Sequence, residues 1–239
     1  MAGGLGSLQA LKEGDIGTGC VLAHNMGLGK TFQGTGYVLA HTMGLGNTFQ
    51  VITFLHTICL SCPENIELRR MLVLGPVNTL YNWKAELARW LPDEGKLPDG
   101  TYIEVFLLDE SGRTNQLRVQ TLESWFKRGG IMCMGYEMYR NLAQGKRVKE
   151  KGNRVKEKVL KAKLERYLRD PGPGIVIADE GHMLRNHKSN ISKEVARIKT
   201  RRRAVLTGSP LQNNLSEYHC MIDFINPGFL GSLAEFKNR

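Results

Sequence analysis

The chain has 239 residues, of which 41% are hydrophobic, and it carries a formal net charge of +10. This length allows one sizeable core or at most two small domains, and the composition is that of a folded protein. No apolar run reaches the roughly 18 residues of a membrane span, and the N-terminus lacks the features of a signal peptide. The five cysteines are scattered and odd in number, which is typical of reduced thiols. Cys59 and Cys62 have the spacing of metal ligands, but the sequence has no second cysteine pair to complete four ligands, so we interpret them as the end of a buried helix. These features exclude a membrane-spanning, secreted or disulfide-stapled protein and favour an intracellular globular one.

A tandem duplication lies near the N-terminus, after residues 1–16, which we expect to be poorly ordered. Residues 17–33 read GTGCVLAHNMGLGKTFQ, and residues 34–50 read GTGYVLAHTMGLGNTFQ. Each copy is a short apolar run, then a glycine-rich turn, then the start of a helix. This layout is typical of a phosphate-binding loop, in which backbone N–H groups and a helix N-terminus face an anion.

The residues that would bind phosphate differ between the two copies. The first copy offers Gly27, Gly29, Lys30 and Thr31, and the second offers Gly44, Gly46 and Thr48, with Asn47 in place of the lysine. Neither copy has the first glycine of the strict G-x-x-x-x-G-K-[ST] pattern. A glycine-rich turn without a ligand therefore remains an alternative when the loop is considered alone.

The segments that come directly after the two turns also differ. After Asn47 the sequence TFQVITFLHTICL is compatible with a helix that has one apolar face. After Lys30, two glycines at 34 and 36 would stop a helix within about two turns. We therefore expect the second copy to be docked in the fold and the first to be looped out ahead of it, although the charge of Lys30 favours the first copy as the phosphate ligand.

Beyond the duplication, predicted strands alternate with predicted helices. Apolar runs predict strands within 71–75, 103–109, 131–135, 175–182 and 204–210. Helices are predicted over 76–91, 114–128, from 136 onward, after residue 152 and over 212–225. The side chains expected to face inward are Trp83, Leu87, Trp90, Leu117, Leu122, Trp125, Leu160, Leu164, Tyr167 and Leu168. This alternation predicts an α/β fold with a parallel sheet covered by helices on both faces.

Most of the positive charge lies in one segment. Residues 146–170 contain eleven Lys or Arg against four acidic residues, and they therefore carry seven of the ten net charges. The segment also contains a tandem repeat, GKRVKEK (145–151) and GNRVKEK (152–158). DNA or another polyanion is the functional interpretation, and a solvated basic helix is the structural one.

Two carboxylates directly follow a predicted buried strand. In IVIADEGH (175–182), four apolar residues lead into Asp179 and Glu180. In a nucleotide-hydrolysing α/β domain, such acids lie at a strand end across from the phosphate loop. We predict that Asp179 holds Mg²⁺, directly or through water, and that Glu180 activates the attacking water. Two surface acids at a strand end are the alternative.

Four motifs in order, MGLGKT, GYEMYR, DEGH and LTGSPLQNN, resemble the motor of the Swi/Snf-type chromatin-remodelling ATPases. VLAH before each loop, GYEMYRNLAQG at 135–145, DPGP at 170–173 and the glycine at 181 are similar to the ATRX subfamily. The resemblance runs from about residue 17 to the C-terminus. It implies a RecA-like first lobe over 17–239, with a basic helical insertion at about 145–170. It also implies binding of ATP and Mg²⁺ and movement along double-stranded DNA in nuclear chromatin.

The resemblance also implies roles for individual residues. Lys30 and Thr31 match the phosphate-binding motif, with Thr31 and Asp179 as magnesium ligands, and residues 179–182 match the hydrolysis motif. The residues that match segments coupling hydrolysis to DNA movement are His182, Thr207, Gly208 and Gln212. The residues that match stretches along the DNA path are Asn78, Thr79, Tyr136 and Asn213.

Three departures from the family weaken the implied activity. Asn47 cannot supply the charge that offsets the β and γ phosphates. The segment that holds adenine has no recognisable counterpart in residues 1–16. The resemblance covers only the first lobe, and the second would supply an arginine worth about 10³–10⁵ in rate in related NTPases. We therefore expect this lobe alone to be inactive. The alternative function is that of a non-catalytic fragment that binds DNA or chromatin. An imperfect or truncated gene copy would also explain the two duplications.

Overall fold

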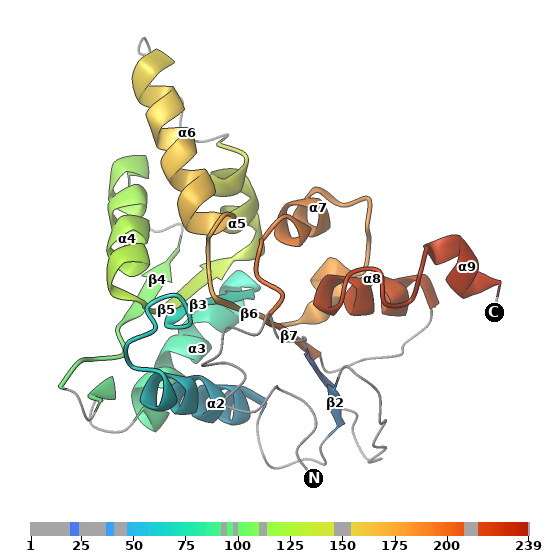
Figure 1. Ribbon diagram of the computed structural model, residues 1–239, viewed down its shortest axis with the longest axis horizontal. Coiled ribbons are helices and arrows are strands. Elements are labelled where there is room, and N and C mark those ends of the chain that lie inside the picture. The colour runs from blue at the N-terminus through green and yellow to red at the C-terminus, as the bar shows by residue number, and fades with distance from the viewer. Residues whose placement is uncertain are drawn as a thin grey trace.

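The computed structural model describes residues 20–23, 37–40, 47–91, 95–97, 100–109, 114–145, 154–207 and 215–238. The predicted disorder of residues 1–16 lies outside the described residues, as do both glycine-rich turns. Strands and helices alternate along the described part of the chain, and helices cover the sheet on both sides (Figure 1). None of the described helices is long and apolar enough to pass through a bilayer.

Within the described residues, the strands form one seven-stranded sheet in the order β2-β1-β7-β6-β3-β5-β4, and every neighbouring pair is parallel. The strands are β1 (Cys20–Ala23), β2 (Tyr37–Ala40), β3 (Arg70–Gly75), β4 (Val105–Leu108), β5 (Gly130–Gly135), β6 (Ile175–Ala178) and β7 (Arg203–Thr207). Parallel strands that are buried on both faces require nearly continuous apolar sequences, as in β3 and β6. Because all the strands are parallel, their carboxyl ends lie at one edge of the sheet, where ligand sites of open α/β sheets are found.

The helices are α2 (Asn47–Ser61), α3 (Val77–Trp90), α4 (Asn115–Arg128), α5 (Tyr136–Ala143), α6 (Arg154–Leu168), α7 (Asn190–Ala196), α8 (Leu215–Ile225) and α9 (Leu233–Lys237), with a short 3₁₀ helix, η2 (Gly181–Leu184). Local sequence explains where they begin and end. Thr114 caps α4 because its side chain accepts a hydrogen bond from the Leu117 N–H. Gly129 ends the same helix with φ of 76°, a conformation that glycine adopts without steric strain.

Two hydrophobic cores lie on opposite faces of the sheet. Helices α2 and α3 cover one face, where Ile52, Leu55 and Trp83 pack on β3, β5, β6 and β7. Helices α4, α5, α6, α7 and α8 cover the other face. Figure 1 shows these two layers on either side of the sheet. The predicted α/β fold with a parallel sheet between two helical layers is confirmed.

The prediction that the first copy of the duplication is looped out of the fold is wrong. Strand β1, from the first copy, lies inside the sheet between β2 and β7, whereas β2, from the second copy, is the edge strand. Each residue of β1 pairs with its own counterpart in the second copy, for example Val21 with Val38. The prediction that a helix follows the second copy is confirmed by α2. Each copy therefore contributes a strand, and in the described part of the chain the second copy leads into α2.

Most residues that were predicted to face inward do so, with exceptions on two helices. Trp83, Leu87, Leu122 and Trp125 are buried, and so are Leu164, Tyr167 and Leu168 on α6, with Leu160 partly buried. The prediction is wrong for Trp90 and Leu117, because their exposed fractions are 41% and 49%. Trp90 is the last residue of α3, where its ring contacts Phe49 of α2 with 4.6 Å between the centroids, and Leu117 lies in the first turn of α4.

Four of the five cysteines, Cys59, Cys62, Cys133 and Cys220, are free and buried; as predicted, Cys59 and Cys62 lie at the end of a helix, Cys59 in the last turn of α2 and Cys62 directly after it. Burial raises the pKa of the Cys59 thiol to about 11 and the pKa values of Cys133 and Cys220 to about 12. The reactive species is the thiolate, so these three thiols should react at least about 100-fold more slowly with iodoacetamide at pH 8 in the folded chain than in urea. Peptide mass spectrometry after timed labelling checks this; fast labelling of Cys133 in the folded chain would contradict the burial.

Candidate functional site

The predicted site residues that the structure describes gather at the carboxyl edge of the sheet. Strand β3 leads into Asn78 and Thr79, β5 into Tyr136, β6 into residues 179–182, and β7 ends at Thr207. These segments are far apart in the sequence, and the parallel order of β7, β6, β3 and β5 brings them to one edge. The sheet therefore assembles one candidate site from four strand ends.

Asp179 is the most firmly held residue of this edge. Its backbone N–H donates to the Leu74 carbonyl at 2.7 Å, and its own carbonyl accepts from the Tyr136 hydroxyl at 2.7 Å. Its carboxylate accepts from the Trp83 indole Nε1–H at 2.8 Å through Oδ2, and from the Glu180 N–H at 2.9 Å through Oδ1. Contacts from β3, α3 and α5 thus fix both the main chain and the side chain of this residue.

The electrostatic surroundings of Asp179 suit a cation. Burial raises the pKa of its carboxyl above the ordinary value, and the nearby Glu180 charge raises it further, although the hydrogen bonds from Trp83 and from the Glu180 N–H oppose the shift. No Lys or Arg among the described residues forms an ion pair with this carboxylate. Each oxygen accepts one hydrogen bond and keeps lone-pair capacity, and ionised oxygens are the ligands that Mg²⁺ prefers. The residue therefore fits a magnesium ligand.

Glu180 adopts a strained backbone conformation. Its φ is 51° and its ψ is 58°, and it is the only non-glycine residue of the described chain with positive φ. Such a conformation costs about 1–3 kcal/mol and is concentrated at functional sites. Its carboxylate lies 3.0 Å from Nδ1 of His182, and both side chains are partly exposed. The turn thus places the second carboxylate beside the partly exposed His182.

Position 181 has no room for a side chain, so glycine is required there. A Cβ at this position would lie 2.2 Å from Cγ1 of Val205 on β7. We predict that Gly181→Ala destabilises the chain by about 1–3 kcal/mol through overpacking, and that Val205→Ala in the same chain recovers about 1 kcal/mol or more of this loss. Urea denaturation of the two single variants and the double variant measures the coupling. Strictly additive free energies of unfolding would contradict the contact.

The remaining described site residues differ in exposure. Asn78 is exposed in the first turn of α3, Thr79 is half-buried beside it, and Thr48 is half-buried in the first turn of α2. Thr207 is buried at the end of β7. Tyr136 is 2% exposed and its hydroxyl donates to the Asp179 carbonyl, so the predicted DNA contact of Tyr136 is not available to its side chain. Tyr136 instead supports the acidic strand end.

The other predicted site residues lie outside the described part of the chain: Gly27, Gly29, Lys30, Thr31, Gly44, Gly46, Gly208, Gln212 and Asn213. The described strands show only where the two loops leave the sheet. Ala23, at the end of β1, pairs with Thr207 of β7, and β7 in turn pairs with β6. The first loop therefore leaves the sheet two strands from Asp179, and the second loop leaves it one strand further away.

One site residue was missed by the sequence interpretation. Trp83 was predicted to be a core residue; it is buried, and in addition it hydrogen-bonds the Asp179 carboxylate. The apolar periodicity of α3 predicts its burial but contains no signal for the direction of its N–H group.

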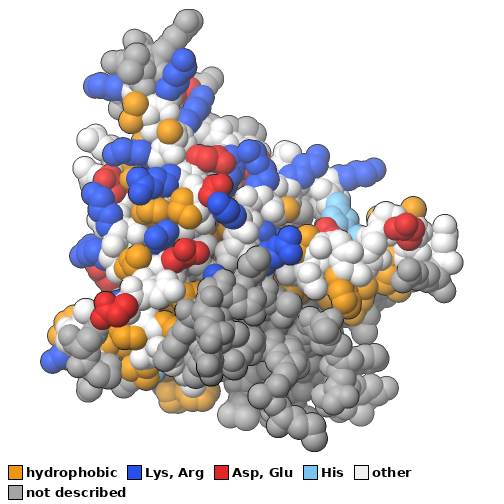
Figure 2. Space-filling view, in the orientation of Figure 1, with side chains coloured by type: hydrophobic (Ala, Val, Ile, Leu, Met, Phe, Trp, Pro, Cys, Tyr) orange, Lys and Arg blue, Asp and Glu red, His pale blue; other side chains and the backbone are white. Residues whose placement is uncertain are grey.

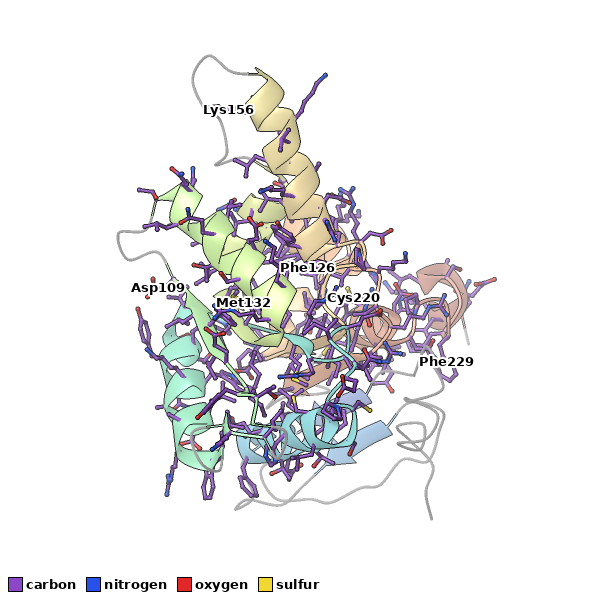
Figure 3. The ribbon with its side chains drawn as sticks, turned by 60° about the vertical axis from the view of Figure 1, so that its left-hand side comes forward. Asp109, Phe126, Met132, Lys156, Cys220 and Phe229 are labelled. Atoms are coloured by element: carbon purple, nitrogen blue, oxygen red, sulfur yellow. The ribbon has the colours of Figure 1, made fainter. Side chains whose placement is uncertain are left out.

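Basic side chains gather on the helical layer that contains α4 and α6 (Figure 2). Lys156, Lys158 and Lys161 are exposed on α6, and Lys156 lies at the outer end of this helix, away from the sheet (Figure 3). Several of these bases pair with acids: Lys163 and Lys127 pair with Glu123, and Lys161 pairs with Glu157. The layer still carries more basic than acidic side chains, with Lys156, Lys158 and Lys161 on the outer half of α6.

The fold and the acidic strand end define a RecA-like α/β domain. The chain belongs to the SNF2-related family, because the model of the SNF2-related domain matches residues 32–239. This match includes the whole second copy of the duplication and only the last two residues of the first.

Curated relatives agree with this assignment and confirm the similarity to the ATRX subfamily. The chain is 48% identical over 223 residues to human "Transcriptional regulator ATRX", covering 93% of this chain and 8% of the relative. It is 41% identical over 233 residues to "Protein CHROMATIN REMODELING 20" of Arabidopsis thaliana, covering 98% and 14%. It is 39% identical over 256 residues to human "Helicase ARIP4", covering 97% and 16%. The chain therefore spans less than a fifth of the length of these relatives.

Solved structures show the same fold. The "Sulfolobus solfataricus SWI2/SNF2 ATPase core in complex with dsDNA" matches with a TM-score of 0.57 and 20% identity, covering 97% of this chain and 36% of that chain. The ATPase core domain of the same organism matches with a TM-score of 0.55 and 21% identity, covering 97% and 35%. At this identity the likeness supports the fold alone, and it confirms the RecA-like architecture.

Proposed function

We propose that this chain is the ATP-binding first lobe of a chromatin-remodelling motor that moves along double-stranded DNA. The observation that carries the proposal is the carboxylate of Asp179, which is held at the end of β6 and has no basic partner among the described residues. A fixed carboxylate without a counter-charge at the ligand edge of a parallel sheet is suited to a metal–nucleotide complex. Membership in the SNF2-related family supports the same conclusion.

In this proposal the two halves of the site have separate roles. Asp179 and Thr31 hold Mg²⁺, and Lys30 with the loop glycines binds the phosphates. A magnesium ion in such a site neutralises charge that develops on the transferred phosphoryl group. Glu180, next to Asp179 and in contact with His182, orients the attacking water as a general base.

DNA contacts involve both the strand-end edge and helix α6, whereas coupling belongs to the edge. Asn78 is exposed in the first turn of α3, and the basic outer half of α6 attracts phosphate groups without sequence preference. His182 and Thr207, with Gly208, Gln212 and Asn213, couple hydrolysis to DNA movement. The substrate is then chromatin in the nucleus, and a second RecA-like lobe supplies the residues that complete hydrolysis.

A second function is favoured by one specific observation. The helix that provides the N-terminus for phosphate binding, α2, begins at Asn47 and not at a lysine. A chain in which this copy occupies the site would bind nucleotide weakly and would act as a DNA- or chromatin-binding fragment. Its DNA affinity would fall with salt and would not respond to ATP.

Calorimetry with Mg·ATP tests the first function. We expect Lys30→Ala to weaken binding about 10- to 100-fold, because a charge-assisted hydrogen bond to phosphate is lost. Asn47→Ala is the matched control at the equivalent position of the second copy, and we expect a change of less than about twofold. Equal binding by wild type and Lys30→Ala would remove Lys30 from the site. Binding to duplex DNA at two salt concentrations, with and without Mg·ATP, distinguishes the second function.

A further inference from the structure

The indole of Trp83 combines two features that are unusual for a core residue. Its ring is 2% exposed within the core that α2 and α3 form on the sheet. Its Nε1–H nevertheless donates a hydrogen bond to a polar group, Oδ2 of Asp179, at 2.8 Å; the two residues are 96 positions apart in the sequence. An indole N–H is a donor only and carries no charge, so it can hold a carboxylate without neutralising it.

The other contacts of Asp179 show why this bond is decisive for the side chain. The bonds from Leu74 and Tyr136 fix only its main chain, and the bond from the Glu180 N–H moves with the same turn. Trp83 is therefore the residue that hydrogen-bonds the carboxylate from a different element of the fold, helix α3. Helix α3 is in turn packed onto the sheet at this point, because Leu80 and Leu87 are buried in the same core as Trp83.

The surroundings leave little freedom for another carboxylate orientation. A Cβ on Gly75 would lie 2.9 Å from Oγ1 of Thr79 and 3.5 Å from Cβ of Asp179, so the end of β3 packs closely against this side chain. The Thr79 hydroxyl itself donates to the Pro76 carbonyl at 2.9 Å. The carboxylate is thus packed by β3 and oriented by α3.

We propose that Trp83 is a positioning residue for the metal carboxylate: its buried N–H fixes the orientation of Asp179 before a cation binds. This inference rests on the proposed function, because it concerns the same magnesium–nucleotide site. A residue that orients a metal ligand typically contributes 10- to 100-fold to metal affinity. Its contribution should therefore appear in metal binding and not in the contacts that the nucleotide makes without metal.

The variant Trp83→Phe removes the N–H group and keeps an aromatic ring in the core. Trp90→Phe is the matched control on the same helix, since the Trp90 indole also donates to a carboxylate, Glu86, at 2.6 Å. Trp90 is 41% exposed and lies outside the site. Both variants lose one indole–carboxylate hydrogen bond, and only one of these bonds involves Asp179.

The measurement is Mn²⁺ affinity, by electron paramagnetic resonance, of the full chain at saturating ADP, together with ADP affinity in the presence of a chelator. We expect Trp83→Phe to weaken Mn²⁺ binding about 10- to 100-fold and to leave metal-free ADP affinity within about twofold. Trp90→Phe should match the wild type in both measurements. Unchanged Mn²⁺ affinity in a folded Trp83→Phe chain, or equal losses with and without metal, would overturn the positioning role.

Failure of the proposed function gives a different result. If the wild-type chain shows no metal-dependent ADP binding, the nucleotide site itself is wrong, whatever the variants do. If Trp83→Phe does not fold, the indole N–H resonance of Trp83 in the wild type, assigned by elimination with Trp90→Phe and Trp125→Phe, replaces it. We expect this resonance to shift when Mg²⁺ is added at saturating ADP, and an unchanged resonance would contradict the inference.

Discussion

A chain that lacks residues 34–50 should bind Mg·ATP about 10- to 100-fold more tightly than a chain that lacks residues 17–33. Either deletion leaves one copy of the duplicated segment, joined directly to the remainder of α2. The two products have equal length and differ at three positions, where one has Cys20, Asn25 and Lys30 and the other has Tyr37, Thr42 and Asn47. The comparison therefore isolates the lysine in an otherwise nearly identical strand, loop and helix.

The two deletion products should also form the same sheet, because their remaining strands are nearly identical. Val21, Leu22 and Ala23 pair with β7, and the same three residue types occur in β2. Either copy can thus occupy the place beside β7, and in both products the extra edge strand is removed. We expect similar melting temperatures for the two products, with the difference confined to calorimetric binding of Mg·ATP. Equal affinities in two folded products would show that Lys30 has no role in binding phosphate.

The second large effect concerns the adjacent carboxylates. We expect Asp179→Asn to reduce the magnesium-dependent part of ADP affinity by about 100-fold, because the charged metal ligand is lost. Glu180→Gln should change it by less than about twofold, because the Glu180 carboxylate contacts His182 and is assigned to the attacking water and not to the metal. Titrations with ADP in Mg²⁺ and in chelator measure both variants. Losses of similar size in the two variants would contradict the separate roles.

Much of the fold follows from local sequence. The apolar runs that become β3, β5 and β6 are buried on both faces, and such runs require a parallel sheet with helices on each side. The candidate acids could be predicted for the same reason, since Asp179 and Glu180 directly follow the apolar run of β6. Because they directly follow a strand of a parallel sheet, their position at its carboxyl edge can be predicted without knowing which strands lie beside β6.

The features that sequence did not predict depend on contacts between distant segments. The two copies have identical residues over most of their strands, so nothing local determines which strand lies beside β7. Trp90 and Leu117 have the same helical spacing as buried neighbours, but they lie in terminal turns of α3 and α4 and stay partly exposed, which the spacing alone does not indicate. The bond from Trp83 to Asp179 depends on how α3 packs against β6, which periodicity along α3 does not describe.

The most direct test is the structure of this chain with Mg²⁺ and a non-hydrolysable ATP analogue. It should show the metal at the Asp179 carboxylate, directly or through one water, with the analogue's phosphates on a glycine-rich turn that follows β1 or β2. An analogue bound far from Asp179, or a metal that contacts neither Asp179 nor its waters, would contradict a shared magnesium–nucleotide site.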